Sequence, residues 1–252
     1  MNPIALITGA TSGFGKAIAE KFAASGYNVI VTGRRNALLQ ELKKDIESRF
    51  PSTVLTLNFD VRDRQVVMDQ LGTIPDAWKH ISILVNNAGL AAGKDYFDEA
   101  LMDDWEAMID TNLKGLLYVT RAVLPNLIAS GKGHIINIGS IAAKNIYEKG
   151  NVYCSTKHAV DALSQSMRID LLRHKIKVTA IHPGAAETEF SLVRLKGNEL
   201  AAKSVYEGYV PLYAEDIAEA VFYVTNLPAH VCINDMVITA TAQADAFYLH
   251  KD

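Results

Sequence analysis

The feature that most constrains the fold of this chain is an alternation of short apolar runs with longer segments of helical periodicity. The runs are rich in β-branched residues and are flanked by Gly, Asn, Asp or Pro, which is typical of strands. They lie at 4–8, 28–32, 54–59, 82–86, 134–138, 177–181 and 231–240. Their continuous apolar character indicates strands that are covered on both faces.

The segments between these runs have the apolar spacing of amphipathic helices. They span 14–25, 36–49, 62–72, 102–130, 153–174 and 214–226. Strand–helix alternation implies right-handed crossovers and a parallel sheet with helices on both faces. We therefore predict an α/β fold in which residues 1–252 form one doubly wound, Rossmann-type domain around a seven-stranded parallel sheet. Residues 187–211 fit this rhythm poorly, and we interpret them as a lid over a substrate.

Composition excludes several classes of protein. A formal net charge of −3 leaves no basic excess for nucleic acid, and no stretch approaches the roughly 18 apolar residues that a membrane span needs. The N-terminus carries no targeting signal. The two cysteines, Cys154 and Cys232, do not make a disulfide framework or a metal cluster. We expect a cytoplasmic protein that binds no nucleic acid, membrane or metal ion.

A glycine-rich turn follows the first apolar run and opens the first helix. Its glycines permit a tight turn and a close approach of the backbone to a pyrophosphate, and the helix end adds free N–H groups. The turn could instead be an ordinary one, but its position favours a dinucleotide site. The residues expected to contact the cofactor here are Gly9, Thr11, Ser12, Gly13, Phe14 and Gly15.

The residue that reads the adenosine ribose usually lies about 20 residues beyond such a turn. This chain has Gly33-Arg34-Arg35 there and no acid nearby. Two guanidiniums suit a 2′-phosphate through charge-assisted hydrogen bonds, which predicts NADP as the cofactor. We expect Arg34 to be the closer contact because it comes first after the strand. The alternative is a solvated basic corner at the start of a helix.

The glycine-rich turn and several further motifs together resemble those of the short-chain dehydrogenases/reductases, and the resemblance covers essentially the whole chain. These motifs are Asn86-Asn87-Ala88-Gly89, Asn112, Ser140 and Tyr153-x3-Lys157, in the order and spacing of that family. The tail, at residues 189–194, 227–231 and 242–244, looks like that of the NADP-dependent serine and 3-hydroxy acid dehydrogenases. The resemblance also implies a homotetramer formed through the helices at 102–130 and 153–174.

The catalytic chemistry can be argued from four residues. Tyr153 and Lys157 are four apart on one helix, so their side chains are neighbours, unless the pair is incidental. A tyrosine with a pKa of about 10 is a poor base, and a nearby ammonium lowers that pKa. The resemblance implies that Ser140 holds the substrate oxygen, although it could be a turn residue. It also implies that Asn112 ends a proton relay through water to Lys157, the alternative being a helix-kink residue.

The resemblance implies more cofactor contacts after the later strands. They are Asp60, Val61, Asn87, Ala88, Gly89, Pro183, Gly184 and Thr188. Asp60 resembles the acid that meets the adenine amino group, but it could instead cap the helix ahead of Arg62. Asn87 could stabilise the sheet. The turn at Pro183-Gly184 would run alongside the nicotinamide, and Thr188 would contact the carboxamide of the nicotinamide or the phosphates of the cofactor.

Together these residues predict an enzyme that moves a hydride between nicotinamide and a small hydroxy or carbonyl substrate. The resemblance implies a 3-hydroxy acid such as serine, allo-threonine or 3-hydroxypropionate. A carboxylate needs a donor, and Arg194 in the lid is our candidate, with a solvated lid residue as the alternative. Other possibilities are a pterin, diketone or 3-oxoacyl reductase, or a redox sensor that holds NADP without turnover. The joint presence of Ser140, Tyr153 and Lys157 argues against the sensor.

Overall fold

The computed structural model describes residues 2–252, which surround one seven-stranded sheet. Its order is β3-β2-β1-β4-β5-β6-β7, and all neighbouring strands are parallel. The strands are β1 (Ile4–Ile7), β2 (Asn28–Gly33), β3 (Val54–Asn58), β4 (Ile81–Asn86), β5 (His134–Ile138), β6 (Lys177–Pro183) and β7 (Asp235–Ile238). The predicted fold class is confirmed. The strand order reverses between β1 and β4, which places a ligand crevice at the carboxyl ends of these strands.

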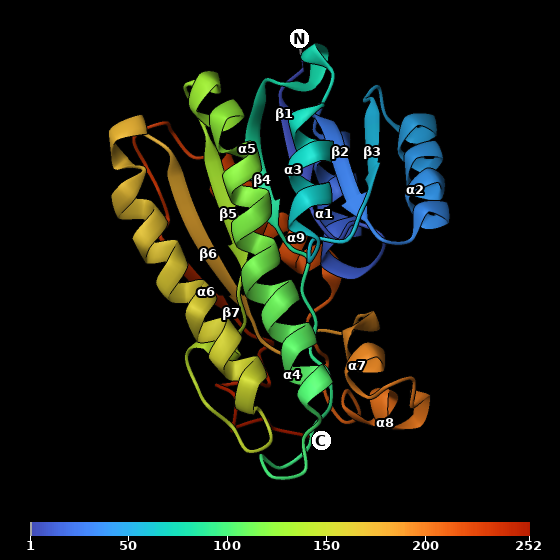
Figure 1. The fold of residues 1–252 in the computed structure, drawn as a ribbon. Helices are drawn as coiled ribbons and strands as arrows, with labels where there is room; N and C mark the ends of the chain where they lie inside the picture. Colours follow the sequence, from blue (N-terminus) through green and yellow to red (C-terminus); the bar gives the residue numbers. More distant parts are fainter. Residues whose placement is uncertain (1) are drawn as a thin grey trace.

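Helices cover both faces of the sheet, as Figure 1 shows. One face carries α1 (Gly13–Ala24), α2 (Asn36–Arg49) and α9 (Ala214–Thr225). The other carries α3 (Arg64–Gly72), α5 (Leu116–Ser130) and α6 (Asn151–Asp170). α4 (Met102–Ile109) leads into α5. These helices agree with the segments of helical periodicity, apart from small shifts at their ends.

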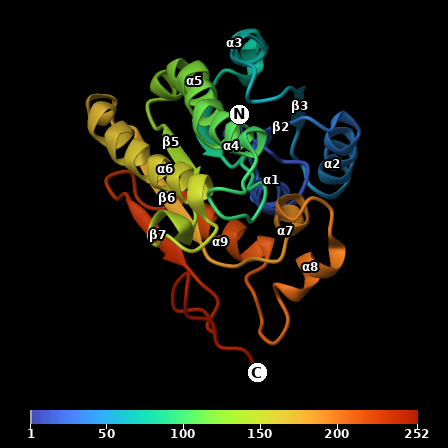
Figure 2. The ribbon, with the colours of Figure 1, turned by 60° about the horizontal axis from the view of Figure 1, so that its bottom comes forward.

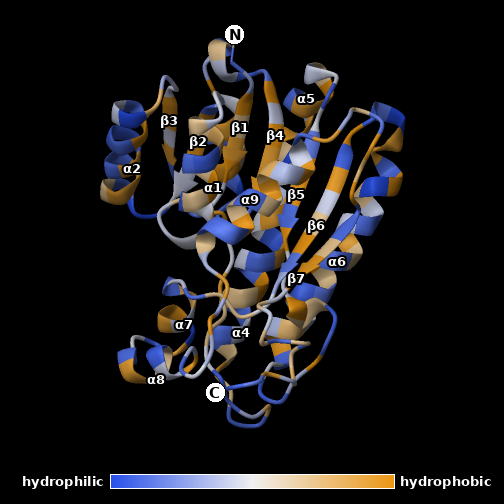
Figure 3. Ribbon diagram, turned by 180° about the vertical axis from the view of Figure 1, so that it is seen from behind, coloured by the Kyte–Doolittle hydropathy of each residue, from blue (hydrophilic) through white to orange (hydrophobic). Residues whose placement is uncertain are grey.

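The two helical layers explain why the strands are apolar throughout. In β1, Ala5 and Ile7 pack into the layer formed by α1 and α9, whereas Ile4 and Leu6 pack into the layer formed by α3 and α5. Successive side chains of a strand point to opposite faces, so both sets are buried. Figure 3 shows the resulting hydrophobic strands behind α1 and α9. Each such aliphatic side chain contributes roughly 1.5–3 kcal/mol on full burial.

The helical segment expected at 102–130 is helical throughout, but it is not α-helical throughout. A π-helical turn, Asp110–Gly115, lies between α4 and α5. At Gly115 a Cβ atom would lie 2.7 Å from Val61 Cγ2, so the helix approaches the segment after β3 closely. π-turns inside helices occur often at functional sites. Here the turn carries Asn112, the residue for which the sequence left open a proton relay or a helix kink.

Residues 187–211 lie beyond the carboxyl ends of the strands and hold two short helices. These are α7 (Glu189–Arg194) and α8 (Glu199–Ser204), at the lower right of Figure 1 and toward the viewer in Figure 2. The segment is tied to the body at its base, where Ala186 and Leu212 form a parallel bridge. In residues 2–252, no helix is both long enough and apolar enough to cross a membrane.

Candidate active site

The glycine-rich turn between β1 and α1 forms an open cradle. Gly9 and Gly13 adopt φ values of +65° and +52°, which L side chains rarely adopt. A Cβ at Gly15 would lie 2.3 Å from the Gly9 carbonyl oxygen. Asn87 Nδ2 holds the turn from below by donating to the carbonyl oxygens of Thr8 and Gly9, at 2.8 Å and 3.1 Å. Because α1 has no acidic residue in its first turn, its amino end is free for an anion.

Arg35 lies against this cradle. Its Nη2 donates to Thr11 Oγ1 and to Ser12 Oγ, both at 2.8 Å. Its Nη1 donates to Glu189 Oε2 of α7 at 3.0 Å. The cation is therefore grouped with two hydroxyls, and these are the donors that a phosphate group prefers. The contacts favour Arg35 over Arg34 as the residue nearer to the cradle, which reverses the order expected from the sequence.

Arg34 is more exposed and pairs with an acid that follows another strand, β3. Its Nη1 lies 3.9 Å from Asp60 Oδ2. Asp60 also accepts from the Arg62 backbone N–H at 3.0 Å and from its guanidinium at 2.7 Å. Burial alone would raise the pKa of Asp60, but the hydrogen bonds from Arg62 hold it below its ordinary value. The capping alternative for Asp60 is wrong, since Asp63 caps α3 by accepting from the Val66 N–H at 3.1 Å.

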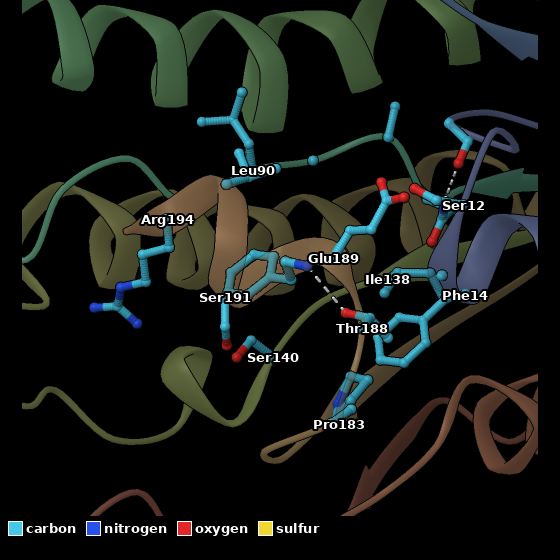
Figure 4. A pocket seen from close by; sticks show the side chains of 18 of the residues that line it. Ser12, Phe14, Leu90, Ile138, Ser140, Pro183, Thr188, Glu189, Ser191 and Arg194 are labelled. Carbon is cyan, nitrogen blue, oxygen red and sulfur yellow. Dashed lines mark hydrogen bonds between the residues drawn. The ribbon is translucent and has the colours of Figure 1, made fainter. Parts of the chain in front are cut away.

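One cavity of about 500 Å³ joins the cradle to the catalytic motif. Figure 4 shows Ser12 and Phe14 at one end and Ser140, Ser191 and Arg194 at the other. The predicted site residues that line it are Gly9, Thr11, Ser12, Gly13, Phe14, Arg34, Arg35, Asp60, Val61, Asn87, Ala88, Gly89, Ser140, Tyr153, Lys157, Pro183, Gly184, Thr188 and Arg194. Two predicted residues, Gly15 and Asn112, are outside this lining.

Tyr153 and Lys157 are both buried neighbours on α6. Lys157 Nζ lies 5.8 Å from the centroid of the Tyr153 ring and donates to the Ile138 carbonyl oxygen at 3.0 Å. Burial lowers the pKa of Lys157 to about 8. Burial also raises the pKa of Tyr153, which opposes the lowering expected from a nearby ammonium. The Tyr153 hydroxyl is therefore protonated at neutral pH and suited to donate its proton.

Ser140 follows β5 and begins a single 3₁₀ turn. Its Oγ accepts from the Ala142 N–H at 3.1 Å, so it does cap that turn. Ser140 also lines the cavity with Tyr153, and its hydroxyl works to lower the pKa of the phenol. The structural and functional interpretations of Ser140 are therefore compatible.

Asn112 fastens the π-turn to the loop after β4. Its Oδ1 accepts from the Leu90 N–H and its Nδ2 donates to the Leu90 carbonyl oxygen, both at 2.8 Å. Nδ2 also donates to Thr156 Oγ1 at 3.1 Å. These contacts hold Gly89 where a Cβ would lie 3.6 Å from Lys157 Nζ. Asn112 is thus close to Lys157 but hydrogen-bonded elsewhere, and its role in a proton relay stays a prediction.

The turn after β6 is held by backbone and amide contacts. The Gly184 N–H donates to the Ile238 carbonyl oxygen at 2.7 Å, and the Ala185 N–H donates to Gln243 Oε1 at 2.8 Å. Thr188 caps α7, and its side chain lies 3.4 Å from the position of a Cβ on Gly13. The lid segment therefore begins directly over the glycine-rich turn.

Arg194 closes the far end of the cavity. Its Nη1 donates to the Tyr147 hydroxyl at 3.1 Å. Its guanidinium carbon lies 5.5 Å from the centroid of the Tyr147 ring and 5.6 Å from that of Tyr153. Its Nε is buried and has no hydrogen-bond partner among the described residues. A cation with an unused donor, stacked on the catalytic tyrosine, is suited to an anionic group on the substrate.

Sequence reasoning missed several residues of this cavity. They are Tyr147, Glu189, Phe190, Ser191, Tyr206 and Gln243. Phe190 packs on Tyr153 with 5.7 Å between ring centroids. Most of these residues belong to no spacing motif and reach the cavity only through tertiary structure. Four of them did carry a signal, because they lie in the tail segments that resemble the 3-hydroxy acid dehydrogenases: Glu189, Phe190, Ser191 and Gln243.

Comparison with known proteins agrees with this geometry. The family model described as short chain dehydrogenase matches residues 3–197. An NADP-dependent 3-hydroxy acid dehydrogenase of Salmonella typhi is 47% identical over 96% of this chain and 97% of its own length. A sulfoacetaldehyde reductase of Chromohalobacter salexigens is 44% identical over the full length of both chains. The closed form of a serine dehydrogenase complexed with NADP+ superposes with a TM-score of 0.92 at 45% identity, covering 99% of this chain and all of the other. The chain belongs to the short chain dehydrogenase family.

Proposed function

We propose that the protein is an NADP-dependent oxidoreductase that interconverts small 3-hydroxy acids and the corresponding 3-oxo acids. The observation that carries this proposal is the single cavity, which has the glycine-rich cradle at one end and Ser140, Tyr153, Lys157 and Arg194 at the other. Fold alone would not define the reaction, and the joint placement of these groups is what supports the proposal. The similarity of the chain to a 3-hydroxy acid dehydrogenase and to a serine dehydrogenase supports the proposal.

The cradle has the chemistry that NADP requires. Gly9 and Gly13 line it without side chains, and Arg35 is grouped with the hydroxyls of Thr11 and Ser12 beside it. These donors would hold the 2′-phosphate, while Asp60 and Val61 line the cavity on the adenine side. When bound, the nicotinamide supplies the hydride chemistry. The protein contributes orientation and electrostatics.

The catalytic residues have separate tasks. In carbonyl reduction the protonated Tyr153 donates its proton to the substrate oxygen, and in alcohol oxidation it takes the proton back. The Ser140 hydroxyl holds the same oxygen beside the phenol. Lys157 keeps a positive charge next to Tyr153 below a pH of about 8, which stabilises the phenolate formed in reduction. We place Asn112 behind Lys157, as the residue that fixes the 89–90 loop.

The substrate acid group would bind Arg194. Arg194 of α7 lines the cavity, its Nη1 donates to Tyr147, and its buried Nε has no partner among the described residues. A carboxylate and a sulfonate both suit such a donor pair. A sulfonated aldehyde is therefore a second candidate substrate, supported by the sulfoacetaldehyde reductase that matches the whole chain. A pterin, a diketone or a 3-oxoacyl thioester offers Arg194 no comparable small anion.

The test is NADPH oxidation against pairs of aldehydes that differ in charge. Malonic semialdehyde and sulfoacetaldehyde provide the anions, and propanal and the methyl ester of malonic semialdehyde provide the neutral partners. Oxidation of serine, allo-threonine and 3-hydroxypropionate with NADP covers the reverse direction. We expect anionic substrates to be preferred about 10–100-fold in kcat/KM, from one charge-assisted contact. NADPH binding without turnover on any of them would favour the sensor alternative.

We propose that residues 187–211 act as a lid. The Arg35–Glu189 and Arg194–Tyr147 contacts fasten α7 to both ends of the cavity, and much of the segment beyond α7 is exposed. Lids exclude water and complete the site. Hydrogen exchange should slow in this segment when NADP and substrate bind together. Unchanged protection throughout the segment would remove the lid from the mechanism.

We also propose a homotetramer. Large apolar side chains are exposed at Leu117 on α5, Ile169 on α6 and Leu172 just beyond it. A second group, Val237 and Tyr248, lies along the edge strand β7 and the segment after it. Two separate apolar faces would allow a tetramer with two kinds of interface. Light scattering should give four times the mass of the chain, and replacing Ile169 with Glu should reduce it.

We place the enzyme in the cytoplasm. Cys154 and Cys232 are free, and Cys154 is buried among site residues, which suits a reducing compartment. Cell fractionation with antibody detection would test this location, and recovery in a membrane or extracellular fraction would contradict it.

A further inference from the structure

A buried histidine that the mechanism above does not use lies directly behind Ser140. The side chain of His182, in β6, is fully buried. Its Nδ1 lies 3.4 Å from the Ser140 backbone nitrogen and 3.2 Å from the Ser140 carbonyl oxygen. The ring occupies the space beside Gly139, where a Cβ would lie 2.4 Å from Nδ1. The imidazole therefore packs tightly against the backbone that presents the catalytic hydroxyl.

The other ring nitrogen faces a cluster of charges from three elements. His182 Nε2 lies 3.0 Å from Asp235 Oδ1 of β7 and 3.7 Å from Asp161 Oδ1 of α6. Lys144, which follows the 3₁₀ turn after Ser140, bridges the second oxygens of these carboxylates, at 2.9 Å from Asp161 and 2.6 Å from Asp235. Asp161, His182 and Asp235 could together ligate a metal ion. The Lys144 ammonium already supplies the cation between the two carboxylates, so we interpret the cluster as an ion network.

The charge of Asp235 favours one tautomer of His182. A carboxylate only accepts hydrogen bonds, so its negative charge at 3.0 Å favours a proton on Nε2, even though the N–H is not aligned well enough for a full hydrogen bond. Nδ1 is then an acceptor. The group that can donate to it is the Ser140 backbone N–H.

We propose that His182 is a positioning residue for Ser140, whose N–H it holds through Nδ1 in the tautomer favoured by Asp235. This inference rests on the proposed role of Ser140 in holding the substrate oxygen. Small displacements of a catalytic group from its productive geometry reduce the rate strongly. His182 thus links the charge cluster to the backbone that presents the Ser140 hydroxyl.

The charge cluster also makes the contact depend on pH. Burial lowers the pKa of His182, Asp235 and Asp161 raise it, and Lys144 lowers it, with a net result below the ordinary value. The ring is therefore neutral at pH 7. When it takes up a proton in acid, Nδ1 becomes a donor, loses the Ser140 N–H and turns to the Ser140 carbonyl oxygen. Turnover should fall on the acid side as this proton binds.

Substitutions at His182 separate positioning from packing. His182→Asn keeps an acceptor near the position of Nδ1, whereas His182→Leu keeps bulk and removes it. A hydrogen bond contributes about 0.5–1.5 kcal/mol net, so we expect kcat to fall about 3–10-fold in His182→Leu and less in His182→Asn. The KM for NADPH should stay unchanged in both. Equal kcat values in the wild type and His182→Leu would overturn the proposal.

Substitutions in the cluster test the pH dependence without changing the imidazole. Asp235→Asn removes a charge that raises the pKa of His182, so the acid limb of kcat should move to lower pH. Lys144→Met removes a charge that lowers the pKa of His182, so the acid limb of the pH profile of kcat should move to higher pH. Arg49→Met is the matched control, because it breaks an ion pair with Asp45 on α2, away from the site. Shifts in the same direction, or none, would contradict the proposal.

NMR can detect the contact between His182 and the Ser140 amide without any turnover. The Ser140 amide resonance should titrate with the pKa of the His182 ring, and the titration should vanish in His182→Leu, or in His182→Asn if the leucine variant fails to fold. A wild type with this titration but no turnover would refute the proposed function and leave the Ser140 contact standing. Turnover without the titration would refute the contact alone.

Discussion

The two ends of the cavity are built in different ways. The nucleotide end is made mainly by short stretches of chain directly after β1, β2 and β3, and its shape depends on backbone conformation at Gly9 and Gly13. The substrate end is made by side chains from separate elements, among them Tyr153 of α6, Arg194 of α7 and Gln243 after β7. The first end is set by local sequence and the second by tertiary packing. Each end should therefore respond to its own substitutions.

Tyr153→Phe should have the largest effect. It removes the transferable proton and keeps the ring, so kcat should fall about 10²–10⁴-fold while NADPH binding is retained. Stopped-flow turnover and a fluorescence titration of NADPH measure the two properties. Tyr147→Phe is the control, since it removes the hydroxyl that contacts Arg194 and leaves the acid in place. If Tyr153→Phe kept near wild-type kcat, Tyr153 would not be the acid.

Arg194→Met should come next. It should raise KM for 3-hydroxy acids about 10–100-fold, because it removes a charge-assisted hydrogen bond. Uncharged esters of the same acids should be affected little. Arg194→Lys keeps the charge and loses the planar fork of the guanidinium, so its KM for 3-hydroxy acids should lie between those of the wild type and Arg194→Met. A uniform change for charged and uncharged substrates would count against a contact with the acid group.

Arg35→Ala should lower kcat/KM for NADP about 10-fold and leave NAD nearly unchanged. The expected factor is at the low end for a charged hydrogen bond because the side chain is about half exposed. Arg34→Ala should have the smaller effect, since Arg34 contacts Asp60 and not the cradle. Kinetics with both cofactors compare these variants. A preserved NADP preference in the double variant would show that another residue reads the phosphate.

Glu189→Gln should have the smallest effect. Glu189 holds Arg35 through an exposed ion pair, which is worth about 0–1 kcal/mol. Removing its charge should free Arg35 and reduce repulsion of the 2′-phosphate, so KM for NADP should fall no more than about 5-fold. KM for NAD is the internal control and should not change. A higher KM for NADP would mean that Glu189 orients Arg35 productively.

The same contrast explains how much could be predicted from the sequence. The strands, the main helices, the glycine-rich turn and the pairing of Tyr153 with Lys157 depend on local spacing, and the structure has them. The direction of Arg35 could not be predicted, because it depends on Thr11, Ser12 and a glutamate about 150 residues away. The raised pKa of Tyr153 likewise follows from burial, which spacing does not reveal.

The π-turn at Asn112 shows a further limit. Periodicity predicted one helix over 102–130, and a π-turn adds no visible break to that pattern. Only the unfavourable helix propensity of asparagine indicated that this position was unusual. Tyr147 carried no signal at all, because its contact with Arg194 joins two segments that are far apart in the chain.

The central claim is that one cavity carries a cofactor end and an acid-binding end that are recognised by different residues. The most direct test is kcat/KM for the wild type, Arg35→Ala and Arg194→Met with NADP and NAD, and with 3-hydroxypropionate and its methyl ester. We predict that Arg35→Ala reduces the NADP/NAD ratio about 10-fold and leaves the acid/ester ratio unchanged, and that Arg194→Met does the reverse. A wild type that prefers neither NADP nor the acid, or variants that change both ratios alike, would contradict the claim.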